Sequence, residues 1–416
     1  MIIKKKFFSF LILNINFFVF SQNSTLSPYS HFGFGKDLSV KTFENRQMGG
    51  VSVYADSTSF SFNNPSSLGK LDFIQYKFGA DYTSSNQKSH TNSAQTSSST
   101  LKYLALAVPT KFFAFSFGLM PKTSTGYRTR LLTEEDGLEN TNLFQGTGGI
   151  NSTFFSLAFN LTTDLSLGAS ASYNFGYIEK TNTRSISSVQ LDTRILTRSE
   201  LSGINYNLGI HYNKKVFKNY FFQISASYEP KSKLQSINNR TISTITNTGA
   251  ISSQEDVQLG LLSETTNQIP SSKIFGFGFG KKSKWFFGSS YKVDSNGINF
   301  PLENIQNLNY ISSKEISIGG FYIPKFDSFT NYFNTITYRL GAKWHQTGIV
   351  INEKSIKDFS ISSGVGLPIG GLSKVNIGLE YGKTGTKSNN LIEENYIIIS
   401  LGLSLSDIWF IKRKYD

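Results

Sequence analysis

The sequence predicts an all-β protein, a single transmembrane β-barrel of about 14 antiparallel strands, from three observations. Apolar side chains alternate with small or polar ones over segments of about ten residues, as in 275–281 and 375–382. The composition suits continuous strands, with 20 Tyr and 37 Phe but only 9 Pro in 416 residues. The gaps between segments alternate between short and long. Because successive side chains of a strand point to opposite faces, each segment has one apolar and one polar face.

Fourteen segments carry this alternation, and they define the predicted wall of the barrel. Short connections fit periplasmic turns, and long ones fit outer loops, which are predicted notably at 123–150, 178–200, 232–271 and 293–313. Residues 232–271 can also hold a further hairpin, so a barrel of 16 strands remains an alternative. The expected strands are 72–84, 98–108, 112–122, 151–161, 164–177, 201–212, 220–231, 272–281, 284–292, 314–324, 334–345, 356–367, 373–382 and 394–405.

The N-terminus predicts export. Three lysines at 4–6 precede the apolar run 7–20, and Ser21 follows. A basic start, a short apolar core and a small residue at the boundary are typical of a cleaved secretory signal peptide. The run is too short to span a membrane. We expect residues 1–21 to be removed and the mature chain to reside in the outer membrane of a Gram-negative cell.

Charged side chains within the strands alternate with aromatic ones. In the segment 334–345, Tyr338, Leu340 and Trp344 alternate with basic residues. An isolated charge facing hydrocarbon costs several kcal/mol, so these charges are expected to face a wet interior. The residues predicted to line the lumen are His211, Glu229, Arg339, Lys343, His345 and Glu380.

Residues 22–69 do not alternate, and they are predicted to form a unit separate from the barrel at 70–416. A flexible periplasmic tail is one interpretation. A compact plug, or hatch, inside the lumen is the other, and apolar residues such as Phe34, Phe43 and Phe60 favour it because they suit a tail poorly. The predicted plug or gate residues are Pro28, Tyr29, Phe32, Gly33, Gly35, Met48, Gly49, Gly50, Asn64 and Pro65.

No motif for catalysis or for a cofactor is found. The chain has no Cys, and its four histidines are far apart in the sequence and lack metal-ligand spacing. We therefore expect no enzyme activity, no metal and no cofactor. The net charge of +13 comes from Lys and Arg scattered over turns and loops. This pattern favours contact with outer-membrane lipid and lipopolysaccharide over nucleic acid.

Three stretches of the sequence resemble the FadL-like family of outer-membrane transporters for hydrophobic compounds, in the form common among Bacteroidetes. The first combines Ser27–Gly33, Met48–Gly50 and Asn64–Ser66. The second is Leu119–Pro121 with Gly126 and Tyr127, and the third runs from Glu394 through Leu403 to Asp416.

The resemblance implies a 14-stranded barrel with an N-terminal hatch and passive uptake of a hydrophobic or amphipathic small molecule. It also implies a lateral exit near the third strand, at Pro121, Gly126 and Tyr127. The alternative is a structural or accessory subunit of a larger outer-membrane complex for secretion or barrel assembly. Its partners would be other outer-membrane or periplasmic proteins.

Overall fold

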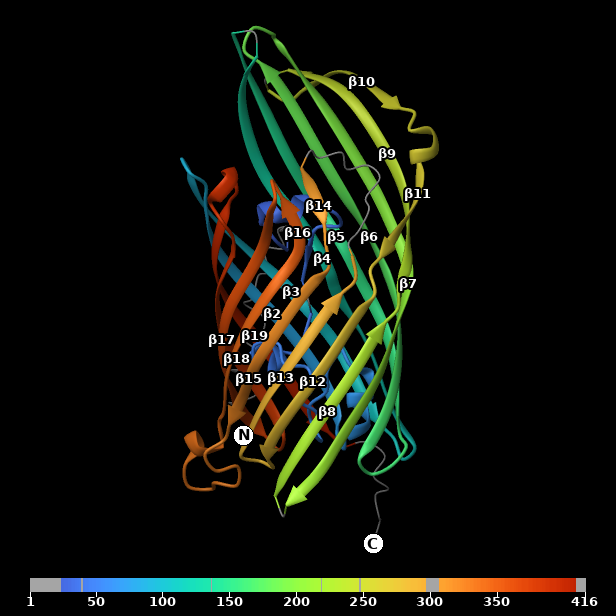
Figure 1. Cartoon of the computed structure of the whole chain (residues 1–416), viewed down its shortest axis with the longest axis vertical. Helices are drawn as coiled ribbons and strands as arrows, with labels where there is room; N and C mark the ends of the chain where they lie inside the picture. The colour runs from blue at the N-terminus through green and yellow to red at the C-terminus, as the bar shows by residue number, and fades with distance from the viewer. Residues whose placement is uncertain are drawn as a thin grey trace, which may run out of the picture.

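The computed structural model describes residues 24–38, 40–135, 137–217, 219–246, 248–296 and 307–408. In these residues the chain forms one closed antiparallel β-barrel of 14 strands with few helices (Figure 1). The last strand, β19 (Glu393–Asp407), closes the ring by pairing with the first, β2 (Ile74–Lys88). The barrel predicted from the sequence is therefore confirmed. The predicted signal peptide, residues 1–21, lies outside the described residues.

The wall strands match the predicted segments closely at one end of the barrel, the end that holds Asp407, here called the lower end. At the upper end several strands are much longer than predicted. The remaining wall strands are β3 (Ser93–Pro109), β4 (Phe113–Glu135), β5 (Leu138–Asn160), β6 (Leu165–Ile186), β7 (Leu191–Phe217), β8 (Tyr220–Glu229), β12 (Ser272–Lys281), β13 (Trp285–Asp294), β15 (Ser313–Tyr322), β16 (Thr337–Ile351), β17 (Lys354–Gly370) and β18 (Ser373–Gly385).

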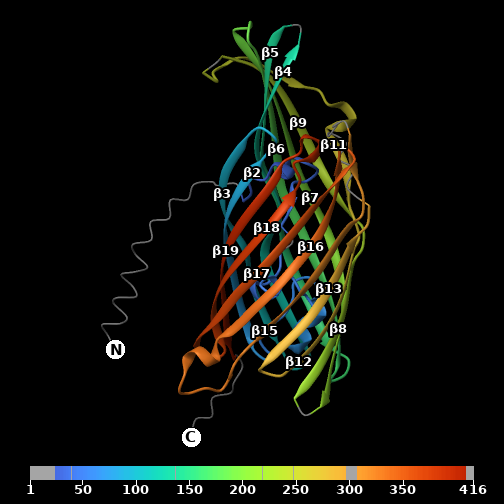
Figure 2. The ribbon, with the colours of Figure 1, turned by 60° about the vertical axis from the view of Figure 1, so that its left-hand side comes forward.

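The prediction of long outer loops at 123–150 and 178–200 is wrong. These residues extend β4 to β7, which stay hydrogen-bonded to one another as far as the Glu135–Leu138 and Arg184–Thr193 pairs. Figure 2 shows this part of the sheet rising above the rest of the barrel. The Ser, Thr and Asn content predicts loops, but Thr and Ile are also strong strand formers, and neighbouring strands supply the backbone partners.

Residues 232–271, also predicted as a loop, contain β9 (Ser232–Thr246), β10 (Ile251–Val257) and β11 (Glu264–Ile269). They continue β8 and β12 upwards, because β7 pairs with β8 in its lower half and with β9 in its upper half. The wall therefore keeps 14 strands and not 16. In the fourth predicted loop, 293–313, β14 (Leu308–Tyr310) pairs with β16, and residues 297–306 lie outside the described part of the chain.

The two faces of the wall have opposite polarity. Large apolar side chains face outward and remain exposed, such as Phe277 at 56% and Leu340 at 63%. Polar side chains face inward and are buried, and Lys77 is only 1% exposed. This arrangement is the inverse of a soluble sandwich, in which the apolar rows would meet in a common core. It suits an apolar solvent outside the barrel.

The N-terminal residues 24–38 and 40–72, here called the luminal segment, lie within the barrel (Figures 1 and 2). They include η1 (Pro28–His31), β1 (Lys36–Asp37), α2 (Phe43–Arg46) and η2 (Pro65–Lys70). Side chains cap the starts of α2 and η2, since the Thr42 side chain accepts from the Asn45 N–H and the Asn64 side chain accepts from the Ser66 N–H. No helix among the described residues is long and apolar enough to cross a membrane.

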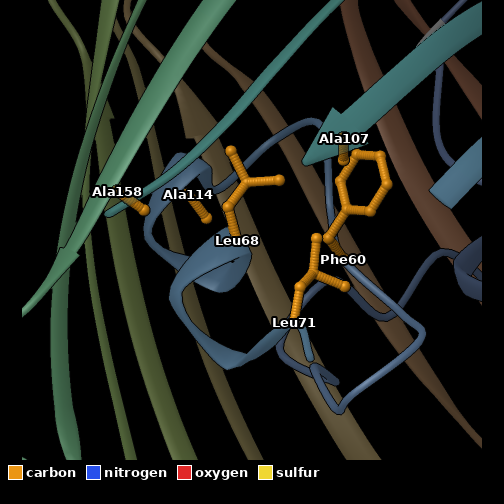
Figure 3. Packing of buried hydrophobic residues seen from close by; sticks show 6 residues of the cluster. All are labelled: Phe60, Leu68, Leu71, Ala107, Ala114 and Ala158. Carbon is orange, nitrogen blue, oxygen red and sulfur yellow. The ribbon is translucent and has the colours of Figure 1, made fainter. Parts of the chain in front are cut away.

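Small inward-facing residues of the wall make room for the luminal segment. Near the lower end, Phe60, Leu68 and Leu71 pack against Ala107, Ala114 and Ala158 of the wall (Figure 3). These six side chains form one buried apolar cluster. Alanine at the wall positions leaves space that larger inward side chains would fill.

Glycines of the wall allow a closer approach, of backbone against backbone. A Cβ atom at Gly341 would lie 2.1 Å from the Gly49 nitrogen, and one at Gly319 would lie 2.3 Å from the Met48 carbonyl oxygen. Gly49 itself has a φ of 70°, a conformation that favours glycine. The stretch 48–50 therefore fits the wall only because β15 and β16 carry glycine at these positions.

Replacing Gly341 with leucine should loosen the luminal segment while leaving the barrel closed. The added side chain collides with backbone and not with a movable side chain, at a cost of about 1–3 kcal/mol for overpacking. We expect faster proteolytic cleavage within residues 40–72 and unchanged heat-modifiable migration of the barrel on gels. Ala169→Leu, on the outward face of β6, is the matched control. Equal cleavage of both variants would contradict this packing role.

Candidate functional site in the lumen and at the β3–β4 edge

Buried ion pairs attach the luminal segment to the wall on several sides. Arg46 of α2 contacts Asp81 of β2, and its Nε lies 2.9 Å from Glu380 Oε2 of β18. Lys41 Nζ lies 2.5 Å from Glu315 Oε1 of β15. Each of these charges would be costly in a buried site without its partner. The pairs therefore specify one position for the segment in the lumen.

A second ion pair near α2 is fully enclosed. Glu44 Oε1 lies 2.6 Å from Lys77 Nζ and also accepts a hydrogen bond from the Ser404 hydroxyl at 2.7 Å. The side chain of Lys77 is 0% exposed and that of Glu44 is 7% exposed. One luminal carboxylate thus neutralises a lysine that a strand points into the barrel.

Hydrogen bonds hold the first turn, η1, near the upper end. Burial raises the pKa of Tyr29 to about 12, so its hydroxyl stays protonated and donates to the Ile392 carbonyl at 2.5 Å. The Ser27 hydroxyl donates to Glu394 at 2.6 Å. The Ser30 hydroxyl donates to the Gly126 carbonyl at 2.9 Å and accepts from the Gly126 N–H at 3.0 Å. The last two bonds use backbone groups of β4.

The wall is not uniformly paired, because β3 and β4 separate above their lower ends. They pair only between residues 104–109 and 114–119. Above this point, residues 93–103 of β3 pair with β2 alone, and the wall partner of β4 is β5 alone. Two strand edges therefore face one another without forming a ladder in the upper part of this seam.

Pro121 stands where the separation begins. The register between β4 and β5 shifts between Pro121 and Thr123, which marks a bulge. Proline has no N–H to donate to a ladder, and bulges bend strands and end pairing. Proline and the bulge thus give a local reason for β4 to leave β3 at this height.

The luminal segment covers part of the freed β4 edge. β1 pairs with it through Lys36↔Ser124 and Asp37↔Thr123, and the Leu38 N–H donates to the Lys122 carbonyl at 3.0 Å. Above this short ladder, the Ser30 hydroxyl hydrogen-bonds to both the N–H and the carbonyl of Gly126. The luminal segment thus supplies β4 with partners that β3 does not.

A cavity of about 320 Å³ lies beside the freed part of β3, between the luminal segment and the upper wall. Its lining includes inward residues of β3, among them Thr96, Ser98 and Thr100. It also includes charged groups such as Lys102 and Asp358. A second cavity, of about 200 Å³, lies on the other side of residues 34–37. Both cavities offer polar contacts as well as apolar ones.

The structure places the ten predicted gate residues along the luminal segment. Pro28 and Tyr29 lie in η1, and Phe32, Gly33 and Gly35 lead from it to β1 along the larger cavity. Met48, Gly49 and Gly50 contact the wall at β15 and β16. Asn64 and Pro65 contact glycines of β6 and β7.

The three residues predicted at the lateral exit all lie on the freed part of β4. Pro121 marks the bulge, and Gly126 is bonded to Ser30. Tyr127 is only 4% exposed, and its ring centroid lies 4.7 Å from that of His31 in a T-shaped contact. Gly126 and Tyr127 therefore contact the luminal segment and do not face the outside of the barrel.

The six predicted lumen-lining residues each contact an inward-facing group. They lie at different heights, three of them (Arg339, Lys343 and His345) on β16, and Lys343 Nζ also lies 3.8 Å from Glu380 Oε1. Their partners are Val53 O for His211 Nε2 at 3.1 Å, Lys122 for Glu229 at 3.2 Å, Asn376 for Arg339 at 3.3 Å, Asp358 for Lys343 at 3.2 Å, the Ser313 hydroxyl for His345 Nε2 at 3.1 Å, and Arg46 for Glu380 at 2.9 Å.

The described lumen holds few groups arranged as catalytic or metal-binding sites require. The pair formed by Ser313 and His345 is the closest approach to a nucleophile and base. Among the described residues, no carboxylate hydrogen bond to the other ring nitrogen of His345 is present. The described residues also contain no group of three His, Cys, Asp or Glu side chains that could hold a metal ion.

Sequence reasoning missed the charges of the luminal segment itself, Lys36, Lys41, Glu44 and Arg46. It also missed their wall partners Lys77, Asp81, Glu315 and Glu394. A signal was present, because a strand that turns Lys77 and Asp81 to the lumen requires opposite charges nearby. The pairing between distant positions could not be read from one sequence.

Replacing Lys77 with methionine should strongly destabilise the luminal segment. Glu44 then remains buried without a cation, at a cost of about 3–5 kcal/mol. Replacing Glu44 with leucine in the same chain should recover most of this loss, because two apolar side chains of similar volume replace the pair. Urea unfolding of the four proteins of this double-mutant cycle measures the coupling.

The control for this cycle is Lys383→Met, which removes a pair with Glu393 whose lysine is 52% exposed. Such exposed pairs contribute less than about 1 kcal/mol. Additive losses in the Lys77 and Glu44 cycle would contradict the proposed neutralisation.

Comparison with solved structures identifies the same barrel fold elsewhere. The monoaromatic hydrocarbon channel CymD aligns with a TM-score of 0.59 at 14% identity, over 89% of this chain and 98% of that chain. The toluene transporter TbuX of Ralstonia pickettii aligns with a TM-score of 0.57 at 16% identity, over 89% and 99%. A Pseudomonas aeruginosa FadL homologue aligns with a TM-score of 0.55 at 12% identity, over 88% and 98%. At identities this low, the alignments establish a shared fold and no more.

Sequence comparison gives a more specific result. No curated protein matches this chain. The model of one protein family, BamG, matches residues 1–416. The resemblance to FadL-like transporters is thus supported at the level of the barrel, while assignment to their Bacteroidetes subgroup stays a prediction. Because the match covers the whole sequence, the chain belongs to the BamG family.

Proposed function

We propose that this protein is an outer-membrane barrel that takes up a hydrophobic or amphipathic small molecule and releases it sideways between β3 and β4. The observation that carries the proposal is the end of β3–β4 pairing at residues 104 and 119, beside the 320 Å³ cavity. The fold is shared with proteins described as a toluene transporter and a monoaromatic hydrocarbon channel, which supports the same class of ligand here.

Placement in the outer membrane is supported by the outward apolar band. On β12, Phe275, Phe277 and Phe279 lie between Lys273 and Lys281. Eight residue steps separate the two lysines, which is roughly 27 Å along a strand. At the 35–45° tilt of such barrels, this length rises roughly 20 Å along the membrane normal, most of an apolar band about 25 Å tall. The short turns and Asp407 then lie on the periplasmic side.

In this proposal the luminal segment is the plug, and its gate is the contact of residues 28–38 with β4. β1 and Ser30 occupy the β4 edge, so a ligand passes only when these contacts open. The contacts with β4 are backbone and hydroxyl hydrogen bonds, and the ion pair of Lys36 with Glu394 in this stretch is longer and more exposed than those of α2. The charged lining of the cavity favours an amphipathic ligand over a pure hydrocarbon. No catalytic role is proposed.

Replacing Pro121 with valine tests the lateral exit. Valine restores a backbone donor and favours a regular strand, so β4 should pair further with β3 and narrow the opening. We expect ligand uptake by cells or liposomes to fall several-fold. Pro368→Val, in the paired lower part of β17, is the matched control and should leave uptake unchanged. Normal uptake by the Pro121 variant would remove the lateral-exit proposal.

A second candidate function is that of a subunit in a larger outer-membrane complex for secretion or barrel assembly. The BamG family match leaves this function open, and one observation favours it: each charged residue in 40–46 forms an ion pair with the wall. A lumen fixed in this way suits a barrel that docks partners. The exposed Lys214 and Lys215, at the lower end of β7, would lie on a periplasmic docking face.

Gentle purification from native membranes distinguishes the two functions. A complex subunit should co-purify with other outer-membrane or periplasmic proteins in fixed stoichiometry, and Lys214→Glu with Lys215→Glu should reduce their recovery several-fold. The control is Lys354→Glu with Lys357→Glu at the upper end. A monodisperse barrel that carries only bound lipid or ligand would contradict the complex and favour uptake.

A further inference from the structure

Three lysines form a row on the outward face of the upper wall. They are Lys273 of β12, Lys314 of β15 and Lys357 of β17. Strand register links them, through Lys273↔Val293↔Lys314 and then Lys314↔Gln346↔Lys357. Successive lysines are thus two strand spacings apart, roughly 9.5 Å. The row follows directly above the apolar band, because each lysine lies two residues from an outward Phe or Ile.

These lysines carry uncompensated charge. All three are exposed, and within the described residues none has a carboxylate at ion-pair distance. By contrast Arg198, also at the upper wall, is neutralised by contacts with Glu179 at 3.7 Å and Glu200 at 3.3 Å. Such a row attracts anionic head groups at a membrane surface.

A groove of about 410 Å³ lies in the lipid-facing wall beside the row. It extends over β7, β8, β12 and β13, and Phe275, two residues below Lys273, is one of its walls. Phe275 faces Ala226 on one side and Tyr291 on the other. The groove forms because Ala226 and Ser289 are small, whereas their outward neighbours are large. Its other apolar lining residues are Ile210, Tyr212, Ile224 and Phe277.

The head of this groove meets the row at Lys273. The Nζ atom of Lys273 lies 5.9 Å from the ring centroid of Tyr228, the outward residue above Ala226 on β8. Cations over aromatic rings are held by the ring quadrupole, and an apolar groove below them fits a hydrocarbon chain. A cationic rim above an acyl-sized furrow is complementary to an anionic lipid.

We infer that this face binds a phosphate-bearing glycolipid of the outer leaflet, of the lipopolysaccharide class. One acyl chain lies in the groove, and the phosphates contact Lys273, Lys314 and Lys357. The inference rests on the outer-membrane placement proposed above and not on uptake. The row lies at the end of the band opposite to Asp407, so it faces the outer leaflet. The lower lysines, such as Lys281, face the other leaflet.

The lysine contribution is tested with a triple variant, Lys273→Gln, Lys314→Gln and Lys357→Gln. Each lysine near an anionic surface contributes about fivefold in affinity, so the triple change should weaken binding on the order of a hundredfold. Native mass spectrometry of the purified full chain, titrated with lipopolysaccharide in mild detergent, measures this. The matched control replaces Lys282, Lys284 and Lys325, exposed lysines of the lower turns, with glutamine.

The groove is tested independently by Ala226→Phe, which fills the furrow without changing charge. We expect weaker lipopolysaccharide binding than in Ala171→Phe, a change on the outward face of β6 away from the groove. Titration with phosphatidylglycerol separates a specific glycolipid site from general attraction to anionic lipid. Wild-type affinity in both the triple variant and Ala226→Phe would overturn the inference, as would equal binding of phosphatidylglycerol.

Failure of the placement itself has a different readout. A protein that fractionates outside the outer membrane would overturn both proposals. A wild-type protein that takes up ligand normally but does not bind lipopolysaccharide would overturn the lipid site alone. Heat-modifiable migration on gels checks that each variant has a folded barrel. Normal migration with unchanged binding in the triple variant counts directly against the lysine row.

Discussion

Backbone hydrogen bonding governs this structure, because N–H and C=O groups facing hydrocarbon have no water to replace a missing partner. A ring of strands satisfies these groups by closure, and β19 pairs with β2 along its full length. The exception is the upper β3–β4 seam, where the ladder stops at residues 104 and 119. There the luminal segment supplies β1 and the Ser30 hydroxyl to β4. The luminal segment therefore lies where β4 has lost β3 as a partner, and it supplies hydrogen bonds that the wall does not.

Charge is the second organising feature, and it separates the two ends of the luminal segment. Around α2, buried pairs with Asp81, Glu380 and Lys77 hold the chain against β2 and β18 on one side of the barrel, and removing one partner leaves a charge in a dry site. Around η1, hydrogen bonds and a two-residue ladder dominate, and the ion pair of the partly exposed Lys36 with Glu394 is longer, at 3.6 Å. A gate requires these upper contacts to open, whereas a barrel that only docks partners needs the base alone. The two candidate functions thus differ in whether the upper contacts open.

The shared barrel fold does not fix the chemistry of the lumen or of the outer surface. The barrel fold is shared with the hydrocarbon channel CymD and the toluene transporter TbuX at identities of 14% and 16%. Proteins that share a fold at such identities can differ in the chemistry of their sites. The larger cavity includes Lys102 and Asp358 among its lining residues, so the interior is more polar than a simple hydrocarbon path needs. Outside, the lysine row and the groove at Ala226 give one side of the barrel a surface suited to an anionic lipid, which is compatible with either function.

The sequence by itself determined the barrel and the inward direction of residues such as Arg339 and Glu380, because alternation along a strand is a local property. It left 14 or 16 strands open, and the pairing of β7 with both β8 and β9 decided for 14. It also marked Pro121, since proline interrupts a ladder wherever it stands. Only the tertiary structure decided that 123–150 and 232–271 are strands, because neighbouring chains supply the hydrogen bonds that polar composition alone does not predict. It alone brought Glu44 to Lys77 and Ser30 to Gly126. Those contacts join residues far apart in the chain, and their geometry depends on how the whole ring closes around the segment inside it.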